Sequence, residues 1–228
     1  GSQTSPRLGL LVALGEGIRF RASYGEAFRA PSIGELFFPF SGNPDLEPET
    51  SESFELGVEQ TLGRWRWGIV AFENRLENLI DFDFVSFSNV NVGRARSRGV
   101  ELEAGYRSDF AIVRWNATYL EAEDRVSGQD LLRRPRESAN LVVTLSPGDW
   151  LLNLTSRFVG QRDDIDPSTF ARSENGGFVR VDLAVKRRLT PRLAPYSRIE
   201  NLLDREYAEV LGFPAPRQTL IGGLAVGL

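Results

Sequence analysis

Carboxylates are the residues with the greatest capacity for chemistry in this sequence, because the chain contains no histidine and no cysteine. Those absences remove the usual nucleophile–base pairs and the commonest metal ligands. Glu101 and Glu103 could form a carboxylate pair for acid–base work. Alternate positions on one strand are better explained by salt bridges to neighbouring strands. No convergent acid–base set accompanies them, and we expect that the protein is not an enzyme.

A second acidic group, Asp163, Asp164 and Asp166, lies in a long polar loop. Calcium takes several oxygen ligands, so such a loop could bind it. Acidic loops are more commonly just solvated, and we predict neither a metal site nor a cofactor. The candidate ligand-binding residues are aromatic and acidic residues of two other loops. They are Phe37, Phe38, Phe40, Asp81, Phe82 and Asp83.

These candidate loops also have a plainer interpretation. The phenylalanines could simply pack their loop onto the rim of the protein. In either case strands must position the loops, and most of the chain alternates between apolar and polar residues, the pattern of a β-strand with two different surroundings. Ile18 and Phe20, for example, alternate with Arg19 and Arg21.

The order of connections indicates how the strands are arranged. We count about eleven strands by their period of two. Short turns near residues 15, 63, 108, 148 and 191 alternate with long loops near residues 40, 83, 127, 168 and 211. This alternation is typical of an up-and-down membrane barrel. Trp65 and Trp67, next to a short turn, suit an interfacial aromatic belt.

The polar positions of these strands are densely charged, and we predict that they line a wet lumen. They are Arg19, Arg21, Glu55, Glu59, Glu101, Glu103, Arg114, Arg157, Arg180, Asp182 and Lys186. A soluble β-sandwich also alternates in this way. Its strands usually recur every 8–12 residues, however, whereas this chain repeats about every 20. The opposite face is also continuously apolar, which favours contact with lipid.

The fold prediction is therefore all-β: an antiparallel up-and-down transmembrane β-barrel of about 10–12 strands, without a plug. We expect one domain over residues 1–228, with residues 1–5 disordered or left from a tag. The longest early apolar run, residues 8–14, is too short for a membrane-spanning helix. The net charge of −4 argues against nucleic acid as a partner.

One predicted strand, from Asn89 to Arg107, is irregular. Its second half alternates cleanly from Val100 onward. In its first half Arg94, Arg96 and Arg98 fall on the same face as Val100. Either a bulge intervenes or these arginines meet lipid headgroups.

Several short motifs together resemble one known family. They are residues 30–32 (APS), 42–50 (GNPDLEPET), 91–101 (NVGRARSRGVE), 119–122 (YLEA), 131–135 (LLRRP) and 199–207 (IENLLDREY). In their order and spacing they resemble the C-terminal barrel half of TonB-dependent outer-membrane receptors of the cobalamin-receptor type. The resemblance covers nearly the whole chain from Pro6 onward and implies a location in the bacterial outer membrane.

The same resemblance implies parts that this sequence does not supply. Receptors of that family are barrels of ~22 strands filled by an N-terminal plug. An odd number of strands does not close an antiparallel barrel, so the first strand is unpaired, another strand is hidden, or two chains combine as a homodimer. The end, Gly227-Leu228, lacks the family's usual aromatic residue. We therefore expect a truncated or engineered plugless barrel.

The resemblance implies uptake of a scarce nutrient of the cobalamin or siderophore class. Expected partners are outer-membrane lipid or detergent, a small nutrient ligand, and the plug and remaining strands of a full receptor. The alternative is a passive pore or a purely structural membrane barrel without active transport.

Overall fold

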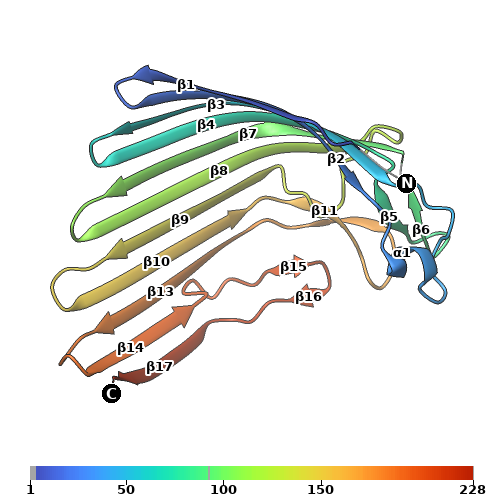
Figure 1. The fold of residues 1–228 in the computed structure, drawn as a ribbon. Coiled ribbons are helices and arrows are strands. Elements are labelled where there is room, and N and C mark those ends of the chain that lie inside the picture. The colour runs from blue at the N-terminus through green and yellow to red at the C-terminus, as the bar shows by residue number, and fades with distance from the viewer. Residues whose placement is uncertain (1–3, 92, 228) are drawn as a thin grey trace.

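One large antiparallel sheet makes up most of the protein in the computed structural model, which describes residues 4–91 and 93–227. Its eleven strands follow the order β1-β2-β3-β4-β7-β8-β9-β10-β13-β14-β17 (Figure 1). They are β1 (Arg7–Gly15), β2 (Ile18–Arg29), β3 (Glu49–Leu62), β4 (Trp65–Glu77), β7 (Arg94–Arg107), β8 (Ala111–Asp124), β9 (Glu137–Leu145), β10 (Trp150–Val159), β13 (Phe178–Arg187), β14 (Leu193–Glu200) and β17 (Thr219–Val226). The predicted all-β antiparallel fold of about 10–12 strands is confirmed.

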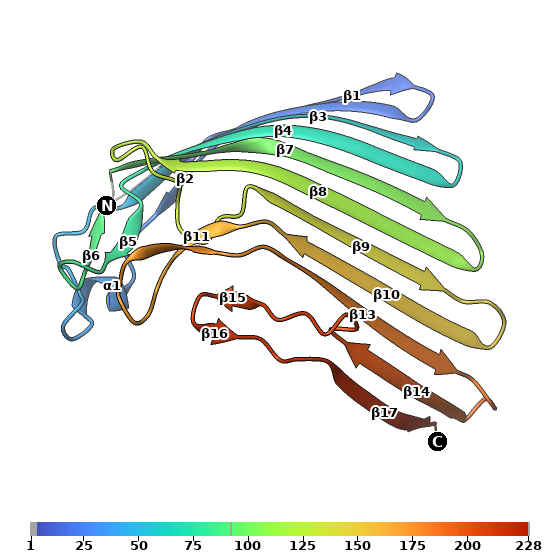
Figure 2. The same ribbon diagram turned by 180° about the vertical axis from the view of Figure 1, so that it is seen from behind.

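Shorter elements connect some of these strands, and they lie at the end of the sheet opposite the short turns (Figures 1 and 2). They are the helix α1 (Ile33–Phe37) and the hairpins β5 (Ile80–Asp83) with β6 (Ser88–Asn91), β11 (Arg162–Ile165) with β12 (Arg172–Asn175), and β15 (Ala208–Val210) with β16 (Phe213–Pro214). We call this the loop end, and the opposite end the turn end. Among the described residues, no helix has the length and hydropathy to cross a membrane.

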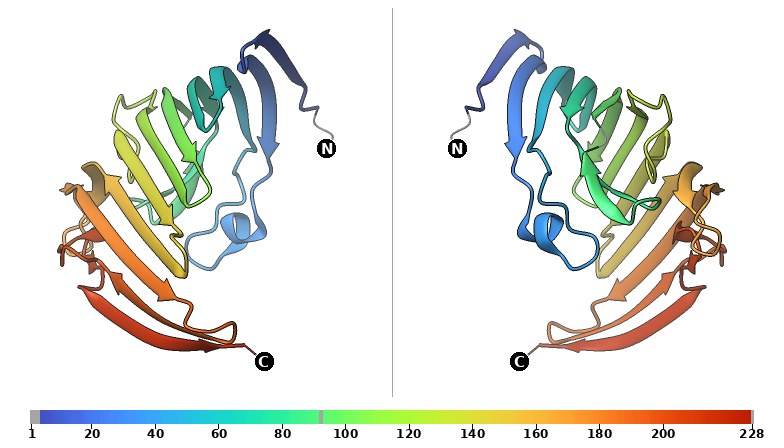
Figure 3. Two further views of the ribbon diagram at one scale, coloured as in Figure 1. Left: turned by 90° about the vertical axis from the view of Figure 1, so that its left-hand side faces the viewer. Right: turned by 90° about the vertical axis from the view of Figure 1, so that its right-hand side faces the viewer.

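The sheet curves into an open arc, and α1 lies toward its hollow side (Figure 3). Within the described part of the chain, β1 pairs only with β2 and β17 only with β14. These two strands are therefore the edges of the arc. A homodimer that joins such edges stays a prediction. The prediction for residues 1–5 falls partly on residues 1–3, which lie outside the described residues.

The register gives the two faces of the sheet opposite character. Across neighbouring strands Leu56 pairs with Ala71, Ala71 with Val100, and Val100 with Tyr119. Large apolar side chains on this face are exposed, including Leu56 and Ile69. A continuous exposed apolar face on a sheet of this size is what contact with hydrocarbon requires.

Aromatic residues border this apolar face near the turn end. The rings of Trp65 and Tyr106 lie 4.7 Å apart, and the Arg187 guanidinium lies 4.9 Å from the centre of the Trp150 ring. Near the loop end the rings of Tyr24 and Phe54 lie 4.8 Å apart. Amphipathic rings at two levels with apolar residues between them form the pattern of interfacial girdles.

The prediction of one strand from Asn89 to Arg107 is wrong. Gly93 adopts φ +77° and its carbonyl accepts from the Asn78 amide at 2.6 Å, so the chain bends there. Residues before it pair with β5, and residues after it form β7 in the large sheet. A left-handed backbone is inexpensive for glycine, which lets the chain leave the small hairpin and enter the sheet at this point.

The arginines at the start of β7 are not explained by a bulge. Their register with β4 is unbroken from Arg94 to Tyr106. Arg96 pairs with Glu73 at 2.7 Å and Arg98 with Glu121 at 2.6 Å, across neighbouring strands. Toward the loop end, ion pairs between neighbouring strands therefore replace the apolar residues of this face.

Candidate ligand-binding loops

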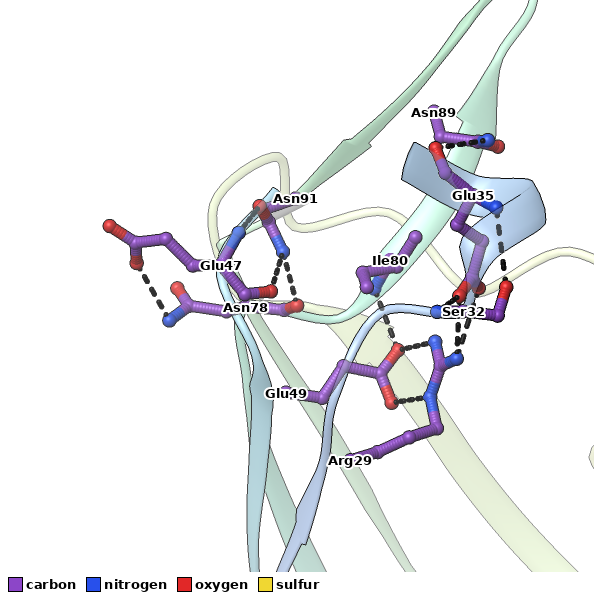
Figure 4. Close-up of polar contacts among 9 residues, drawn as sticks. All are labelled: Arg29, Ser32, Glu35, Glu47, Glu49, Asn78, Ile80, Asn89 and Asn91. Atoms are coloured by element: carbon purple, nitrogen blue, oxygen red, sulfur yellow. Dashed lines mark hydrogen bonds and ion pairs between the residues drawn. The ribbon is translucent and has the colours of Figure 1, made fainter. Parts of the chain in front are cut away.

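Arg29 joins both ends of the loop that connects β2 to β3 (Figure 4). Its guanidinium donates two hydrogen bonds of 2.6 Å to the Glu49 carboxylate and bonds of 2.9 and 3.0 Å to that of Glu35. Glu49 also accepts from the Ile80 amide at 2.8 Å. Bidentate pairs of this kind fix geometry as well as adding energy. The loop is thus closed at its base and joined to β5.

The helix α1 is short, and its start is specified by local sequence. The Ser32 hydroxyl accepts from the Glu35 amide at 3.2 Å, and the Glu35 carboxylate accepts from the Ser32 amide at 2.7 Å. This is a capping box, which satisfies two helix amides reciprocally. The bonds from Arg29 and Ser32 lower the pKa of Glu35 to about 2. Glu35 is therefore a charged anchor at ordinary pH.

Three asparagines and one glutamate connect this loop to the β5–β6 hairpin (Figure 4). The Asn91 side chain accepts from the Glu47 amide at 2.9 Å and donates to the Glu47 and Asn78 carbonyls at 3.0 and 2.6 Å. Asn78 donates to the Glu47 carboxylate at 3.0 Å. The Asn89 side chain donates to the Glu35 carbonyl at 3.2 Å. The two segments thus form one hydrogen-bonded unit.

The predicted phenylalanines lie at the surface of this unit. Phe37, Phe38 and Phe40 are each at least 63% exposed, and Phe40 has φ +75°. Because these rings are largely exposed, they add little packing to the loop. The hydrogen bonds described above hold the loop in place. Three solvated rings on a fixed loop are available to contact a ligand. Their role in binding stays a prediction.

The hairpin residues have more local roles. Asp83 accepts from the Val85 and Ser86 amides at 3.0 and 3.1 Å and from the Ser86 hydroxyl at 2.7 Å. The Ser86 hydroxyl, then the two amides, hold the pKa of Asp83 below its ordinary value. Asp81 accepts from the Phe82 amide at 2.8 Å. Both carboxylates therefore stabilise the local backbone of the hairpin and also give it negative charge.

Phe82 belongs to an aromatic cluster that the sequence analysis missed. Its ring lies 5.1 Å from Phe84 and 6.3 Å from Phe87, and Phe87 lies 6.3 Å from Phe170. Phe170 comes from the loop between β11 and β12. The cluster therefore joins two loops that are more than 80 residues apart in sequence. Nothing in the local pattern around Phe170 indicates this contact.

The acidic loop is organised around a buried carboxylate, that of Asp164. Asp164 is 0% exposed and accepts from the Arg133 side chain at 2.7 Å and from the Ile165 and Leu211 amides, each at 2.8 Å. Burial alone would raise the pKa of Asp164, but the Leu211 amide and the Arg133 guanidinium outweigh it and hold the pKa below its ordinary value. Arg133 belongs to the segment 131–135, noted above only for its family resemblance.

The other two acids of this loop have different partners. Asp163 pairs with Arg172, and Asp166 accepts from the Ser168 and Thr169 amides at 2.7 and 3.1 Å. Within the part of the chain that the structure describes, no three acidic side chains are grouped so as to hold a metal ion. Protein donors thus already engage each of the three carboxylates.

A second buried polar centre was also missed. Asn201, which is 2% exposed, donates to the Arg205 and Pro216 carbonyls at 2.9 and 3.3 Å and accepts from the Arg205 amide at 2.9 Å. It shapes the segment 199–207, whose sequence was noted only for its resemblance. A buried asparagine that satisfies several backbone groups specifies a loop conformation.

All the charged residues predicted for the lumen fall on the face opposite the apolar one. Arg66, which was not predicted, connects two of them: it pairs with Glu59 at 3.0 Å and with Glu103 at 3.1 Å. Arg19 also pairs with Glu59, at 2.9 Å. This face lines a hollow of about 450 Å³. Glu103 is thus part of a cross-strand ion-pair ladder. That this face bounds a lumen stays a prediction.

A sheet with one lipid-type face, one charged face and fixed loops at one end can be compared with known proteins. The model of the family described as "TonB dependent receptor-like, beta-barrel" matches residues 1–202. The chain belongs to the TonB-dependent receptor β-barrel family. Members of this family are bacterial outer-membrane proteins, so the predicted family and location are confirmed.

A curated relative is the vitamin B12 transporter BtuB of Vibrio vulnificus (strain YJ016), which is 30% identical over 211 residues. The match covers 91% of this chain and 34% of the relative. This chain therefore spans about a third of that relative's length. The relative is a transporter, which agrees with the expectation, at the level of the family, that the protein is not an enzyme.

Solved structures share the fold. The copper transporter OprC superposes with a TM-score of 0.81 at 21% identity, covering 96% of this chain and 38% of that one. The ferripyoverdine receptor of the outer membrane of Pseudomonas aeruginosa gives 0.78 at 19% identity, covering 97% of this chain and 32% of that one. The ferric-catecholate import receptor Fiu of E. coli K12 gives 0.78 at 17% identity, with 96% and 34% covered.

Proposed function

We propose that this chain forms part of the barrel wall and the ligand surface of a receptor that takes up a scarce nutrient of the cobalamin or siderophore class. The observation that carries the proposal is the fixed loop unit. It presents the exposed rings of Phe37, Phe38 and Phe40 from a base held by Arg29 and Asn91. Similarity to a vitamin B12 transporter and, in fold, to a ferripyoverdine receptor supports this nutrient class.

The physical reason is preorganisation. A loop that is already ordered loses little conformational entropy when a ligand binds, so more of the contact energy appears as affinity. Exposed aromatic rings supply large apolar area to a macrocycle or a chelate with few rotatable bonds to freeze. The charged face would then line a wet interior, which in this proposal holds the plug of the longer receptor.

The test is ligand binding to the detergent-solubilised receptor that contains this chain. Cyanocobalamin and a ferric siderophore are titrated against the wild type and the variant F37S/F38S/F40S. We expect the triple variant to weaken binding of one of these ligands by about tenfold or more. The matched control is F110S, because Phe110 is also exposed but lies at the turn end.

Equal affinity of the wild type and the triple variant for both ligands would remove the aromatic loop from the binding surface. The alternative of a passive pore is tested in the same preparation. Steady conductance across a planar bilayer without any ligand, combined with no nutrient binding, would replace the receptor proposal by the pore.

A further inference from the structure

A hollow of about 680 Å³ opens at the loop end of the sheet, between β9, β10, β13 and the segment after β14. The apolar row of the sheet leads into it: Ala139 pairs with Phe158 and Phe158 with Val179. Leu203, which is 60% exposed, also lines the hollow. Its floor is therefore a continuation of the face that contacts hydrocarbon.

Two glycines line the hollow. Gly160 follows β10 and Gly177 precedes β13, each two residues beyond the Phe158–Val179 pair. A Cβ added to Gly177 would lie 2.9 Å from the Val159 carbonyl oxygen, and one added to Gly160 would lie 3.0 Å from the Glu137 carbonyl oxygen. At these positions the backbones approach so closely that glycine is favoured.

Two arginines and one glutamate line the hollow: Arg136, Arg205 and Glu137. Arg136 pairs with Asp130 at 2.9 Å and its side chain remains 60% exposed. Among the residues that the structure describes, the Arg205 guanidinium makes no ion pair. Guanidinium groups bind phosphate through paired, parallel hydrogen bonds, and Arg is favoured wherever this geometry matters.

We propose that this hollow is a binding site for a phosphorylated lipid of the outer leaflet. The acyl part lies on Phe158, Val179 and Leu203, and the phosphate is bound by Arg136 and Arg205. The level in the membrane fits this occupant, because the hollow lies where the apolar face gives way to charged residues. The proposal depends on membership of an outer-membrane family and not on which nutrient the receptor takes up.

The side of the sheet on which the hollow lies separates this site from the nutrient surface. Phe158 and Val179 share the face of Leu141 and Leu183, whereas the charged residues Arg157 and Arg180 point to the opposite side. A nutrient that passes through the barrel interior does not meet this face. A lipid that surrounds the barrel does.

The experiment is native mass spectrometry of the purified receptor in a neutral detergent, titrated with bis-phosphorylated lipid A. We expect one lipid A retained by the wild type, and retention about tenfold weaker in R136Q/R205Q. Phosphatidylethanolamine, which has no net charge, should be retained more weakly than lipid A. Inorganic phosphate should not displace lipid A, because it lacks the acyl part that lies on the apolar floor.

The matched control is R19Q/R66Q. It removes two guanidiniums from the charged face of the sheet, each already paired with Glu59, and both lie outside this hollow. Retention within about twofold of the wild type supports a built site. Equal loss in both double variants, equal retention of the two lipids, or displacement by phosphate alone would overturn the proposal.

A second variant tests the proposal independently, in case R136Q/R205Q does not fold. L203E places a carboxylate beside the proposed phosphate at an exposed position and leaves both arginines in place. We expect it to weaken retention of lipid A by repulsion. A properly folded L203E receptor that retains lipid A as the wild type does would also overturn the proposal.

Discussion

The protein fixes its loops with two arginine–carboxylate centres that differ in burial. At the first, Arg29 is shared by Glu35 and Glu49, and all three side chains keep some contact with solvent. At the second, Arg133 meets Asp164, whose side chain has none. A solvated pair is easily replaced by water, whereas a buried carboxylate leaves its donors without partners when it is removed. The two centres should therefore respond very differently to the same substitution.

The largest effect is expected from D164A. It removes the acceptor of the Ile165 and Leu211 amides and of Arg133, which come from three separate segments. We expect the free energy of local opening at these loops to fall by about 2–3 kcal/mol, because two amides and one guanidinium lose the buried carboxylate that accepts from them. Hydrogen exchange at the Leu211 amide measures this directly.

The neighbouring substitution D163N sharpens the same comparison. Asp163 also pairs with an arginine, Arg172, but both side chains are partly exposed. We expect a change below about 1 kcal/mol, the usual range for exposed pairs. If D163N and D164A open the loop equally, burial is not what distinguishes the two acids.

At the solvated centre, E49A should have an intermediate effect. It removes both bonds from Arg29 and leaves the Ile80 amide without its acceptor, but Arg29 keeps Glu35. We expect about 1–2 kcal/mol less stability at the base of the loop. Exchange at Ile80 reports it. E26A serves as control, since Glu26 lies on the neighbouring strand β2 and, among the hydrogen bonds of the described residues, its carboxylate accepts only from the exposed Tyr24 hydroxyl of the same strand. Slow exchange at Ile80 in E49A would contradict this account.

The two centres also show which features of the fold can be predicted from the sequence and which cannot. The period of two predicted the strands, their number and the alternation of short turns and long loops, because each strand has one apolar and one charged face. The capping residues Ser32 and Glu35 are local in sequence. The strand from Asn89 to Arg107 was predicted wrongly because one glycine, Gly93, can end a strand without a change in polarity.

The buried centre lay beyond the reach of local pattern. Asp164 meets Arg133 and Leu211 across 31 and 47 residues. From sequence, Asp164 was indistinguishable from the solvated acids Asp163 and Asp166. Its role depends on which loops meet at one end of the curved sheet, and only the three-dimensional arrangement fixes that. The same holds for Phe170 in the aromatic cluster.

The last comparison uses pH at the solvated centre. Folding lowers the pKa of Glu35 from its ordinary 4.5 to about 2, first through Arg29 and then through Ser32. A lowered carboxyl pKa contributes stability above the unfolded value, and this is lost as the pH falls through the folded value. Opening of the α1 loop should therefore be constant above pH ~5 and increase between pH ~4.5 and ~2. Hydrogen exchange of α1 in E35Q should show a weaker increase over this window. An equally steep increase in E35Q would assign the pH dependence to another group, such as Glu49 beside the same guanidinium.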